Sequence, residues 1–382
     1  MELSKEEKVQ APVASSARCE VRGVWHRPNS SEKEYDLNGL CEVLDQFKRS
    51  GINLVFVEAF YHGMTLFKTE LVPYHTREAE CTYGDYPDYL TAFVEEAAKR
   101  GIDVYAWVQD FYVGFRENAK LVVDHPDWLL KNQSGNIRHT TEGQGFGGYI
   151  FLDPSNSEVR EFLVTLYDEL LTKVPKIKGL NLDYIRYPIS ELSEDTDTGY
   201  TASAISEFAK KHSLSLDESN LEASFLATLK EEGLEDEWIA HRAEYITGFV
   251  ESVRRMIDTK HPDKKISTAV FAEIEQTYKM KKQNIRVWIE RSYVDFVTPM
   301  VYFYEAEQIR NALIKLQDVC KGIKCYTGLY TTFHKQTVAE LDEHIVASAE
   351  GGSDGFVLFD AAKTFFEASE DYESFLGERY GK

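Results

Sequence analysis

Four carboxylate side chains come at the ends of short apolar segments, where they could act on a bound substrate. They are Asp183, Glu273, Glu58 and Asp110. Glycoside hydrolysis requires two carboxyl groups facing one cleft, because one protonates the departing oxygen while the other attacks the sugar or activates water. We therefore expect Asp183 to be catalytic together with Glu273 or Glu58.

The choice of partner sets the expected geometry. Asp183 and Glu273 follow consecutive predicted strands, and neighbouring strands lie ~4.8 Å apart, so their carboxyl groups would suit a retaining mechanism. One predicted strand separates Glu58 from Asp183, which favours the wider inverting geometry. A salt bridge or a helix cap would explain Glu58 or Asp110 equally well.

Aromatic and polar residues at or near the same strand ends form the predicted substrate-binding set. Aromatic rings stack on sugar faces, although rings of the same kind also fill barrel interiors. Arg186 follows Asp183 by three positions and could keep a carboxylate ionised, bind an acidic or acetamido group of a substrate, or form a structural ion pair. The predicted substrate-binding residues are Trp25, His26, Trp107, Gln109, Asp110, Asn181, Tyr184, Arg186, Tyr302 and Tyr330.

Eight short segments rich in Val, Ile, Tyr and Phe position these residues, and longer segments with helical periodicity separate them. The predicted strands span 21–27, 53–59, 103–110, 179–185, 266–272, 294–301, 324–330 and 355–360. The predicted helices span 36–50, 87–100, 156–173, 240–260, 281–291, 306–320, 337–350 and 362–378. Eight strands, each followed by a helix, specify an α/β fold of the (β/α)8 TIM-barrel type.

The connections after the second, third and fourth predicted strands are long and span 61–86, 111–153 and 188–238. In a (β/α)8 barrel the loops that follow strands build the C-terminal face, where active sites lie. We expect these loops to form the walls of a cleft. Residues 1–17 are polar and predict a flexible tail, and residues 18–382 predict a single catalytic barrel.

Charge and composition exclude several classes of function. The 382 residues include 43 Lys and Arg against 64 Asp and Glu, a net charge of −21, which disfavours nucleic acid as a partner. No apolar run reaches the ~20 residues of a membrane-spanning helix, so we expect no integral membrane segment. Five cysteines without a CxxC pair predict free thiols. The polar N-terminus lacks the apolar stretch of a secretory signal, which indicates a cytoplasmic chain or a mature form.

Six segments together resemble the glycosyl-hydrolase-like family ten barrels. They are RGVWHRP, GINLVFVEAF, GIDVYAWVQ, KGLNLDYIRYP, VDFVTPMVY and DGFVLFD, and LDYIRYP is the most specific string. The resemblance covers most of residues 21–360 and implies a (β/α)8 barrel of bacterial type that is associated with the cell envelope and acts on cell-wall glycan strands. It also implies that Asp183 is catalytic, and it matches Glu273 less securely.

Two positions depart from the family pattern. The third strand commonly ends in Trp-x-Asn, and here Gln109 takes the place of the Asn. Glu58 stands where we expect an uncharged polar residue.

Three hypotheses of function follow. The first is a glycoside hydrolase without a cofactor that cleaves a polysaccharide or oligosaccharide, from the cell envelope or otherwise containing amino sugars. The second is a carbohydrate-binding barrel without catalytic activity. The third is a metal-dependent hydrolase that uses His26, His62, His75, His139 and the carboxylates. The first strand ends without a His-x-His pair, so we predict no metal site.

Overall fold

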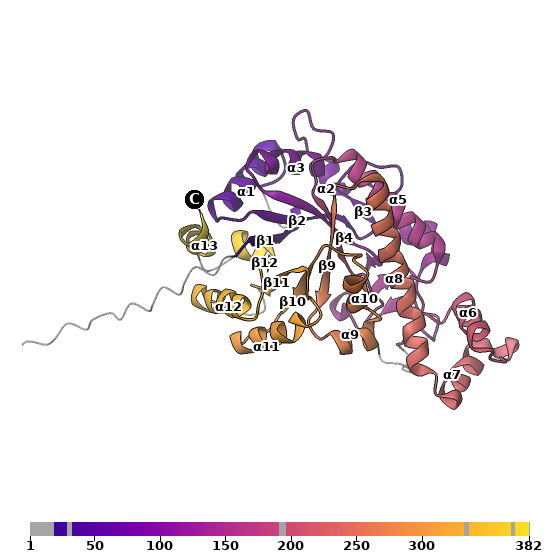
Figure 1. Cartoon of the computed structure of the whole chain (residues 1–382). Coiled ribbons are helices and arrows are strands. Elements are labelled where there is room, and N and C mark those ends of the chain that lie inside the picture. The colour runs from indigo at the N-terminus through magenta and orange to yellow at the C-terminus, as the bar shows by residue number, and fades with distance from the viewer. Residues whose placement is uncertain (1–18, 29–32, 191–195, 332–335, 368–370, 382) are drawn as a thin grey trace, which may run out of the picture.

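A closed barrel of eight parallel strands forms the centre of the molecule (Figure 1). The computed structural model describes residues 19–28, 33–190, 196–331, 336–367 and 371–381, so the predicted tail 1–17 lies outside the described residues. The barrel strands are β1 (Val21–His26), β2 (Leu54–Tyr61), β4 (Asp103–Gln109), β8 (Gly179–Asp183), β9 (Lys265–Phe271), β10 (Phe296–Met300), β11 (Lys324–Tyr330) and β12 (Gly355–Phe359). Each strand pairs with the next in this order, and β12 pairs with β1. The predicted (β/α)8 barrel is confirmed.

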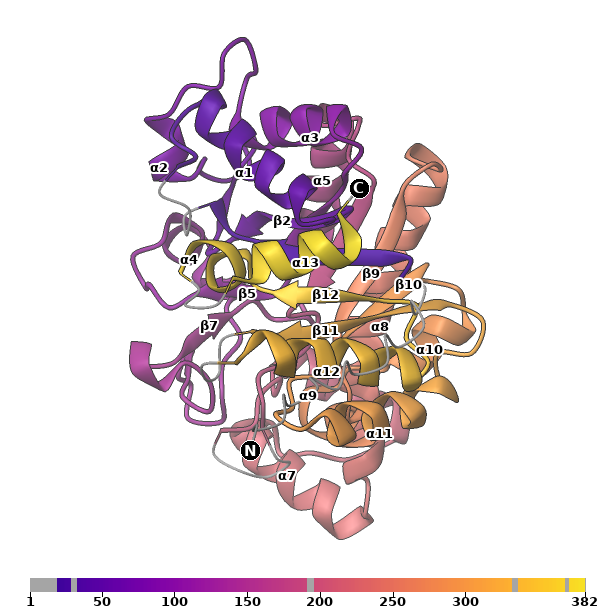
Figure 2. The same ribbon diagram turned by 90° about the vertical axis from the view of Figure 1, so that its left-hand side faces the viewer.

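Helices surround the barrel and follow its strands (Figures 1 and 2). They are α1 (Leu37–Arg49), α3 (Tyr89–Lys99), α5 (Ser157–Lys173), α8 (Glu235–Lys260), α9 (Ile274–Lys281), α10 (Ile285–Glu290), α11 (Ala306–Gln317), α12 (Val338–Glu350) and α13 (Tyr372–Tyr380). Asp36 and Asp88 begin α1 and α3, because each carboxylate accepts a hydrogen bond from a first-turn N–H group. Where the sequence predicts a helix over 281–291 the chain forms α10, and the separate short helix α9 precedes it.

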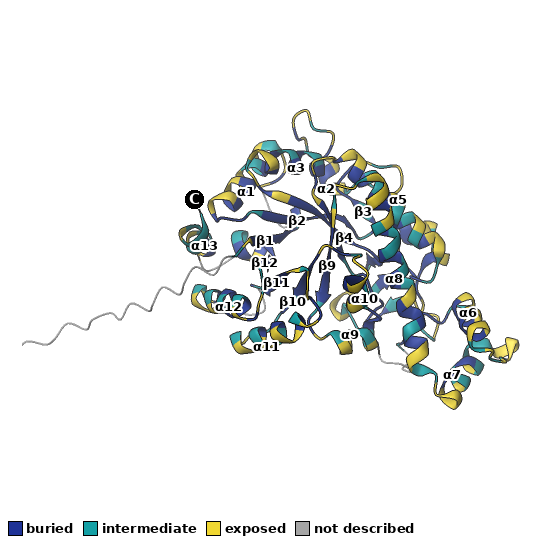
Figure 3. Cartoon of the chain, in the orientation of Figure 1, coloured by how far each residue is buried: buried dark blue, intermediate teal, exposed yellow. Residues whose placement is uncertain are grey.

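Two apolar layers hold the strands in place, and Figure 3 shows the barrel strands as largely buried. Side chains alternate between the two faces of each strand. Inside the barrel, the aromatic side chains include Trp25, Phe56, Tyr105, Trp107 and Phe296, all buried. The outward-facing side chains pack against the helices in a larger core cluster. The barrel interior is therefore filled, and ligands have access only at its ends.

The connections after β2, β4 and β8 carry secondary structure of their own. β3 (Met64–Thr65) pairs antiparallel with β2, and α2 (Thr76–Ala79) follows it. After β4, a small antiparallel sheet forms from β5 (Tyr112–Gly114), β6 (Arg138–His139) and β7 (Tyr149–Phe151). The same connection contains α4 (Lys120–Asp124) and the 3-10 helices η2 (Pro126–Trp128) and η3 (Gln144–Phe146). After β8, the helices α6 (Ala202–His212) and α7 (Leu221–Glu232), joined by η4 (Glu218–Asn220), extend away from the barrel beside the start of α8 (Figure 1).

Three further findings concern the described residues. Within the described residues, no helix combines the length and the apolar character needed to cross a bilayer. All five cysteines have free thiols, as predicted. The predicted last helix over 362–378 consists of a π-helix, η5 (Ala362–Phe366), and of α13, and residues 368–370 between them lie outside the described residues.

Candidate active site

Asp183 ends β8 and is half-buried, with both carboxylate oxygens held by donors. The indole N–H of Trp107 donates to Oδ2 at 2.9 Å, and the backbone N–H of Tyr184 donates to Oδ1 at 2.7 Å. Burial raises the pKa of Asp183 above its usual range, while these two bonds and the charges of Arg186 and Arg27 lower it. Tyr184 has a left-handed backbone with φ of 52°, which a residue with a side chain rarely adopts. The backbone at the end of β8 and the Trp107 side chain therefore hold this carboxylate in a fixed orientation.

Glu58 on β2 is the second carboxylate of the site. Gln109 Nε2 donates to Glu58 Oε1 at 2.7 Å, and Arg27 Nε donates to the same oxygen at 3.2 Å. Burial raises the pKa of Glu58, the charge and hydrogen bond of Arg27 lower it, and the negative charges of Asp183 and Asp360 raise it. Glu58 and Asp183 thus influence each other electrostatically, which places both at the same end of the barrel.

Arg27 contacts Glu58 and the ring of Trp107, which in turn donates to Asp183. Sequence reasoning missed Arg27. Its guanidinium lies 4.7 Å from the ring centre of Trp107 and 5.2 Å from that of Phe359. Its Nη1 lies 3.6 Å from Asp360 Oδ2. The sequence does carry a signal, because the period of two along β1 places Arg27 on the same face as Trp25. Phe359 and Asp360 end β12 in the same way and were also missed.

Three aromatic rings form one side of the site. Tyr302, Tyr330 and Phe359 are half-buried, and the ring centres of Tyr302 and Tyr330 lie 5.1 Å apart. Tyr330 and Phe359 are stacked at 5.7 Å. Burial raises the pKa of Tyr302, and the charge of Asp183 raises it further, so Tyr302 lies near the carboxylate. These rings have the exposure that stacking on a sugar requires.

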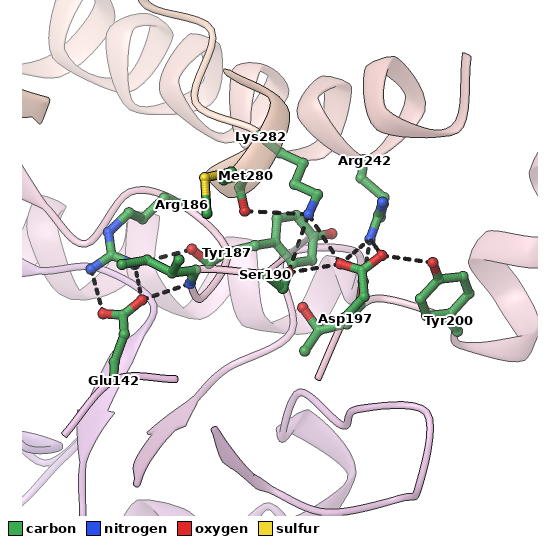
Figure 4. Close-up of polar contacts among 11 residues, drawn as sticks. Glu142, Arg186, Tyr187, Ser190, Asp197, Tyr200, Arg242, Met280 and Lys282 are labelled. Carbon is green, nitrogen blue, oxygen red and sulfur yellow. Dashed lines mark hydrogen bonds and ion pairs between the residues drawn. The ribbon is translucent and has the colours of Figure 1, made fainter. Parts of the chain in front are cut away.

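Arg186 forms the structural ion pair that the sequence left open (Figure 4). Its Nη1 and Nη2 donate to the two carboxylate oxygens of Glu142 at 2.7 and 2.8 Å. Burial raises the pKa of Glu142, but the charge of Arg186 outweighs it and brings this pKa below its usual range. Such a bidentate pair has fixed geometry, and it fastens the loop at Glu142 to the end of β8 beside Asp183. The guanidinium also lies 4.8 Å from the ring centre of Tyr184.

Trp25, Trp107 and Asn181 lie beneath the site. Both tryptophans are 1% exposed and Asn181 is fully buried, so the two indole rings present no face for a sugar. Trp25 Nε1 donates to Asn181 Oδ1 at 3.1 Å, and Trp107 binds Asp183. The expectation that these residues contact substrate is corrected, because inward side chains in the middle of a strand pack against one another. Trp107 instead donates a hydrogen bond to Asp183. Gln109, which is 3% exposed, donates one to Glu58.

His26 and Asp110 point away from the site, and the expectation that they bind substrate is also corrected. Each follows an inward-facing residue, so alternation turns it toward the helices. His26 is fully buried beside the rings of Phe47 and Phe93. Asp110 is fully buried and accepts a hydrogen bond from the hydroxyl of Tyr167 on α5 at 2.7 Å.

Glu273 lies at the start of α9, two residues beyond the end of β9. β9 ends at Phe271, and Glu273 occupies the exposed position that precedes α9. It lines a hollow between α9 and α11 together with Asn311 and Lys315. The expected pairing of Glu273 with Asp183 depended on strand adjacency alone, and it stays a prediction.

The histidines of the metal hypothesis belong to separate contacts. His26 bonds to Glu34, His62 lies 3.3 Å from the Tyr112 hydroxyl, and His139 lies 3.2 Å from the carbonyl of Leu130. Across the described residues, no group of three or more His, Cys, Asp or Glu side chains is arranged to hold a metal ion.

Comparison with known proteins places the chain among glycosidase-like barrels. Residues 20–344 match the family described as glycosyl hydrolase-like 10. The glycosyl hydrolase DigH of Escherichia coli (strain K12) is 25% identical over 186 residues, which cover 44% of this chain and 39% of that protein. An S-layer-related protein of Niallia circulans is 23% identical over 311 residues, which cover 72% of this chain and 19% of that protein. The chain thus spans well under half the length of either relative.

Solved structures share the fold. The catalytic domain of β-amylase from Paenibacillus polymyxa superposes with a TM-score of 0.60 at 9% identity, covering 94% of this chain and 96% of that one. A β-galactosidase from the psychrophilic Marinomonas ef1 superposes with a TM-score of 0.59 at 13% identity, covering 88% of this chain and 53% of that one. At these identities the likeness shows the barrel alone. The family match extends over most of the barrel, and the chain belongs to the glycosyl hydrolase-like 10 family.

Proposed function

We propose that this protein is a glycoside hydrolase that cleaves a polysaccharide by acid/base catalysis with Asp183 and Glu58. The observation that carries the proposal is the arrangement around β4. Trp107 and Gln109 are two residues apart on this strand and share one face. Trp107 binds Asp183 of β8 on one side, and Gln109 binds Glu58 of β2 on the other. One strand thus holds two carboxyl groups at the end of the barrel where active sites lie.

The environments of the two groups favour different roles. Both oxygens of Asp183 accept bonds from groups that can only donate, which favours its ionised form. Gln109 and Arg27 both donate to Oε1 of Glu58, and burial with the negative charges of Asp183 and Asp360 favours its neutral form against the opposing charge of Arg27. We assign the base to Asp183 and the acid to Glu58, with the proton on Oε2.

The strand arrangement supports an inverting reaction. β4 lies between β2 and β8, so the backbones of Glu58 and Asp183 are about two strand spacings, roughly 10 Å, apart. Inverting enzymes have carboxyl groups about 6.5–9.5 Å apart, which leaves room for a water molecule. Asp183 takes a proton from that water as its oxygen bonds to the anomeric carbon. Glu58 gives its proton to the departing oxygen as the glycosidic bond breaks.

The substrate class comes from the relatives and from the aromatic side of the site. DigH is described as a glycosyl hydrolase, and the other relative as S-layer-related. We infer a glycan of the bacterial cell envelope, or another glycan that contains amino sugars, as the substrate, and an extracytoplasmic location. Tyr302 and Tyr330 are exposed enough to stack on a sugar ring. The two carboxyl groups carry the chemistry without a cofactor.

Peptidoglycan strands freed of their peptides test the proposal directly. Mass spectrometry detects the cleaved products, and NMR reads the anomer that forms first. We expect cleavage with inversion, and we expect Asp183→Asn and Glu58→Gln each to lower the rate by about 10²–10⁴. Retention at the anomeric carbon would refute the pairing of Asp183 with Glu58.

A carbohydrate-binding barrel without catalytic activity is the second candidate. The observation that favours it is the Glu58 side chain, which is 2% exposed and paired with Arg27. The charge of Arg27 favours the ionised form of Glu58, and burial restricts the access of a sugar oxygen to it. Strand binding by the wild-type protein without any cleavage, and with the same affinity in Asp183→Asn, would establish this second function.

A further inference from the structure

A row of aromatic rings extends from the residue after Asp183 to the exposed end of a glycine-rich loop. Tyr184 stacks on Tyr112 at 4.5 Å between ring centres, and the Tyr112 ring lies 5.6 Å from that of His62. The His62 ring lies 5.4 Å from Phe115, which stacks on Phe146 at 4.6 Å. The row joins the end of β8, strand β5, the turn after β2 and the helix η3. Residues from four parts of the chain therefore form one aromatic track.

The inner end of the track lies at the proposed catalytic groups. Burial lowers the pKa of His62 to about 4, and the positive charge of Arg27 is the next cause. Burial raises the pKa of Tyr112, and the charges of Arg27 and Glu58 also act on it. Both rings thus lie within the electrostatic field of the site. The track begins beside the site and leads away from it.

The outer end of the track is open to solvent. Phe146 is 58% exposed, whereas Tyr112 is 4% exposed and supports the row from behind. Tyr184, His62 and Phe115 have intermediate exposure. A single exposed aromatic side chain is ordinary on a protein surface, but this ring continues a row that leads to the proposed catalytic groups. Tyr184, His62, Phe115 and Phe146 are therefore the rings of this row that a sugar can reach.

Several contacts fix the loop that carries Phe146. Arg138 Nη1 donates to the carbonyl of Phe146 at 3.4 Å, and the Glu142–Arg186 pair fastens the start of the loop. Gly143 has a left-handed backbone with φ of 66°, and a Cβ atom there would lie 2.2 Å from the ring of Tyr149. The loop can therefore bend in this way only with glycine at this position. A ring that is held before the ligand arrives loses little entropy on binding.

We propose that Phe146, supported by Phe115, is a remote subsite that stacks on a sugar unit several units away from the bond that is cleaved. This inference rests on the proposed function and adds to it a contact for a sugar unit far from the cleaved bond. The ring steps of 4.5–5.6 Å bring Phe146 within about 20 Å of Tyr184, so one extended chain can contact both. Arg116 lies 5.7 Å from the ring centre of Phe115 and adds donors for sugar hydroxyl groups.

The test uses the full chain, peptide-free peptidoglycan strands, and the disaccharide unit of those strands. Phe146→Ala should raise the KM for the strands about three- to tenfold, because stacking on an aromatic ring contributes a factor of that size. It should leave kcat for the strands and the activity on the disaccharide unchanged. Phe146→Tyr keeps a ring and should restore the wild-type KM. Ile314→Ala is the matched control, because Ile314 is 52% exposed on α11 and lies outside the track.

The outcomes separate this inference from the proposed function. The subsite would be refuted, and the hydrolase retained, if Phe146→Ala cleaves strands with an unchanged KM. The same holds if Phe146→Ala lowers the activity on strands and on the disaccharide equally. Strand binding that depends on Phe146, without any cleavage, would support the subsite and refute the hydrolase. If calorimetry finds no binding of the strands by the wild-type protein and Phe146 instead governs binding of lipid vesicles or of a protein, the subsite is refuted.

Discussion

Arg27 and Glu58, from the adjacent strands β1 and β2, form an ion pair in which Arg27 Nε donates to Glu58 Oε1 at 3.2 Å. Glu58 is 1% exposed, so this cation acts on a carboxyl group that water hardly reaches. The pair therefore controls how readily Glu58 holds a proton. The same guanidinium lies over Trp107, the donor to Asp183, so one cation is in contact with the surroundings of both carboxylates.

Replacing Arg27 by Gln should shift the alkaline limb of the pH–rate profile to higher pH. The charge of Arg27 lowers the pKa of Glu58, so its loss leaves burial and the charges of Asp183 and Asp360 to raise that pKa further. The proposed acid then stays protonated to higher pH. The profile of kcat/KM against pH measures the shift. Arg286→Gln is the control, because Arg286 pairs with Glu275 on the surface. An unchanged alkaline limb would remove Glu58 from the role of acid.

Trp107→Phe should shift the acid limb to higher pH and lower kcat about ten- to a hundredfold. The hydrogen bond from Trp107 lowers the pKa of Asp183 and orients its carboxylate, so without it Asp183 is ionised over a narrower range. Trp25→Phe is the matched control, since Trp25 has the same 1% exposure and donates to Asn181 instead. Equal effects of the two substitutions on the acid limb would show that packing, and not this bond, is responsible.

Asp110→Asn should stabilise the protein at neutral pH. Burial raises the pKa of Asp110 well above its usual range, and its buried Oδ2 has no hydrogen-bond partner among the described residues. The folded state therefore binds a proton that the unfolded state has lost, so the free energy of unfolding falls as pH rises above the unfolded pKa of about 3.9. The amide keeps an oxygen for the Tyr167 hydroxyl and never ionises. Urea unfolding from pH 4 to pH 8 should show a smaller decrease in the variant, and an equal decrease would contradict this account.

Asp197, Arg242 and Lys282 form a buried cluster of charges (Figure 4). Replacing Asp197 should lower the free energy of unfolding more than replacing Lys282. All three side chains are fully buried, and Asp197 lies 3.0 Å from Arg242 Nη1 and 3.1 Å from Lys282 Nζ. Asp197→Asn leaves two buried cations without their counter-ion and should cost about 3–5 kcal/mol of unfolding free energy. Lys282→Met leaves the remaining pair balanced and should cost much less. Urea unfolding compares the two variants, and equal costs would refute the role of charge balance.

The shifted pKa of Lys282 should make the free energy of unfolding depend on pH. Burial, with the charge of Arg242, lowers its pKa to about 7. Between about pH 7 and the unfolded pKa of about 10.4, the unfolded chain binds a proton that the folded chain does not. The free energy of unfolding should therefore rise with pH over this interval, and Lys282→Met should reduce the rise. A rise of the same size in the variant would show that other groups cause it.

The local pattern of the chain was sufficient to predict the barrel and the position of Asp183. Short segments rich in Val, Ile, Tyr and Phe marked all eight strands, and segments with helical periodicity marked the helices between them. These signals are local, because they depend on residues within a few positions of one another. The string LDYIRYP placed Asp183 at the end of its strand for the same reason.

The surroundings of Asp183 depended on contacts between residues far apart in the chain. Glu58, Glu273 and Asp110 all end apolar segments and look alike in the sequence, yet only the folded chain turns Asp110 toward α5 and places Glu273 at the start of α9. Side chains alternate between the two faces of a strand, so the residue at which a strand ends decides whether the next side chain points into the barrel or toward the helices. The Arg27–Glu58 and Arg186–Glu142 pairs join segments 31 and 44 residues apart, and no local pattern specifies such partners. Which ionisable groups meet is therefore a property of the closed barrel and its long loops.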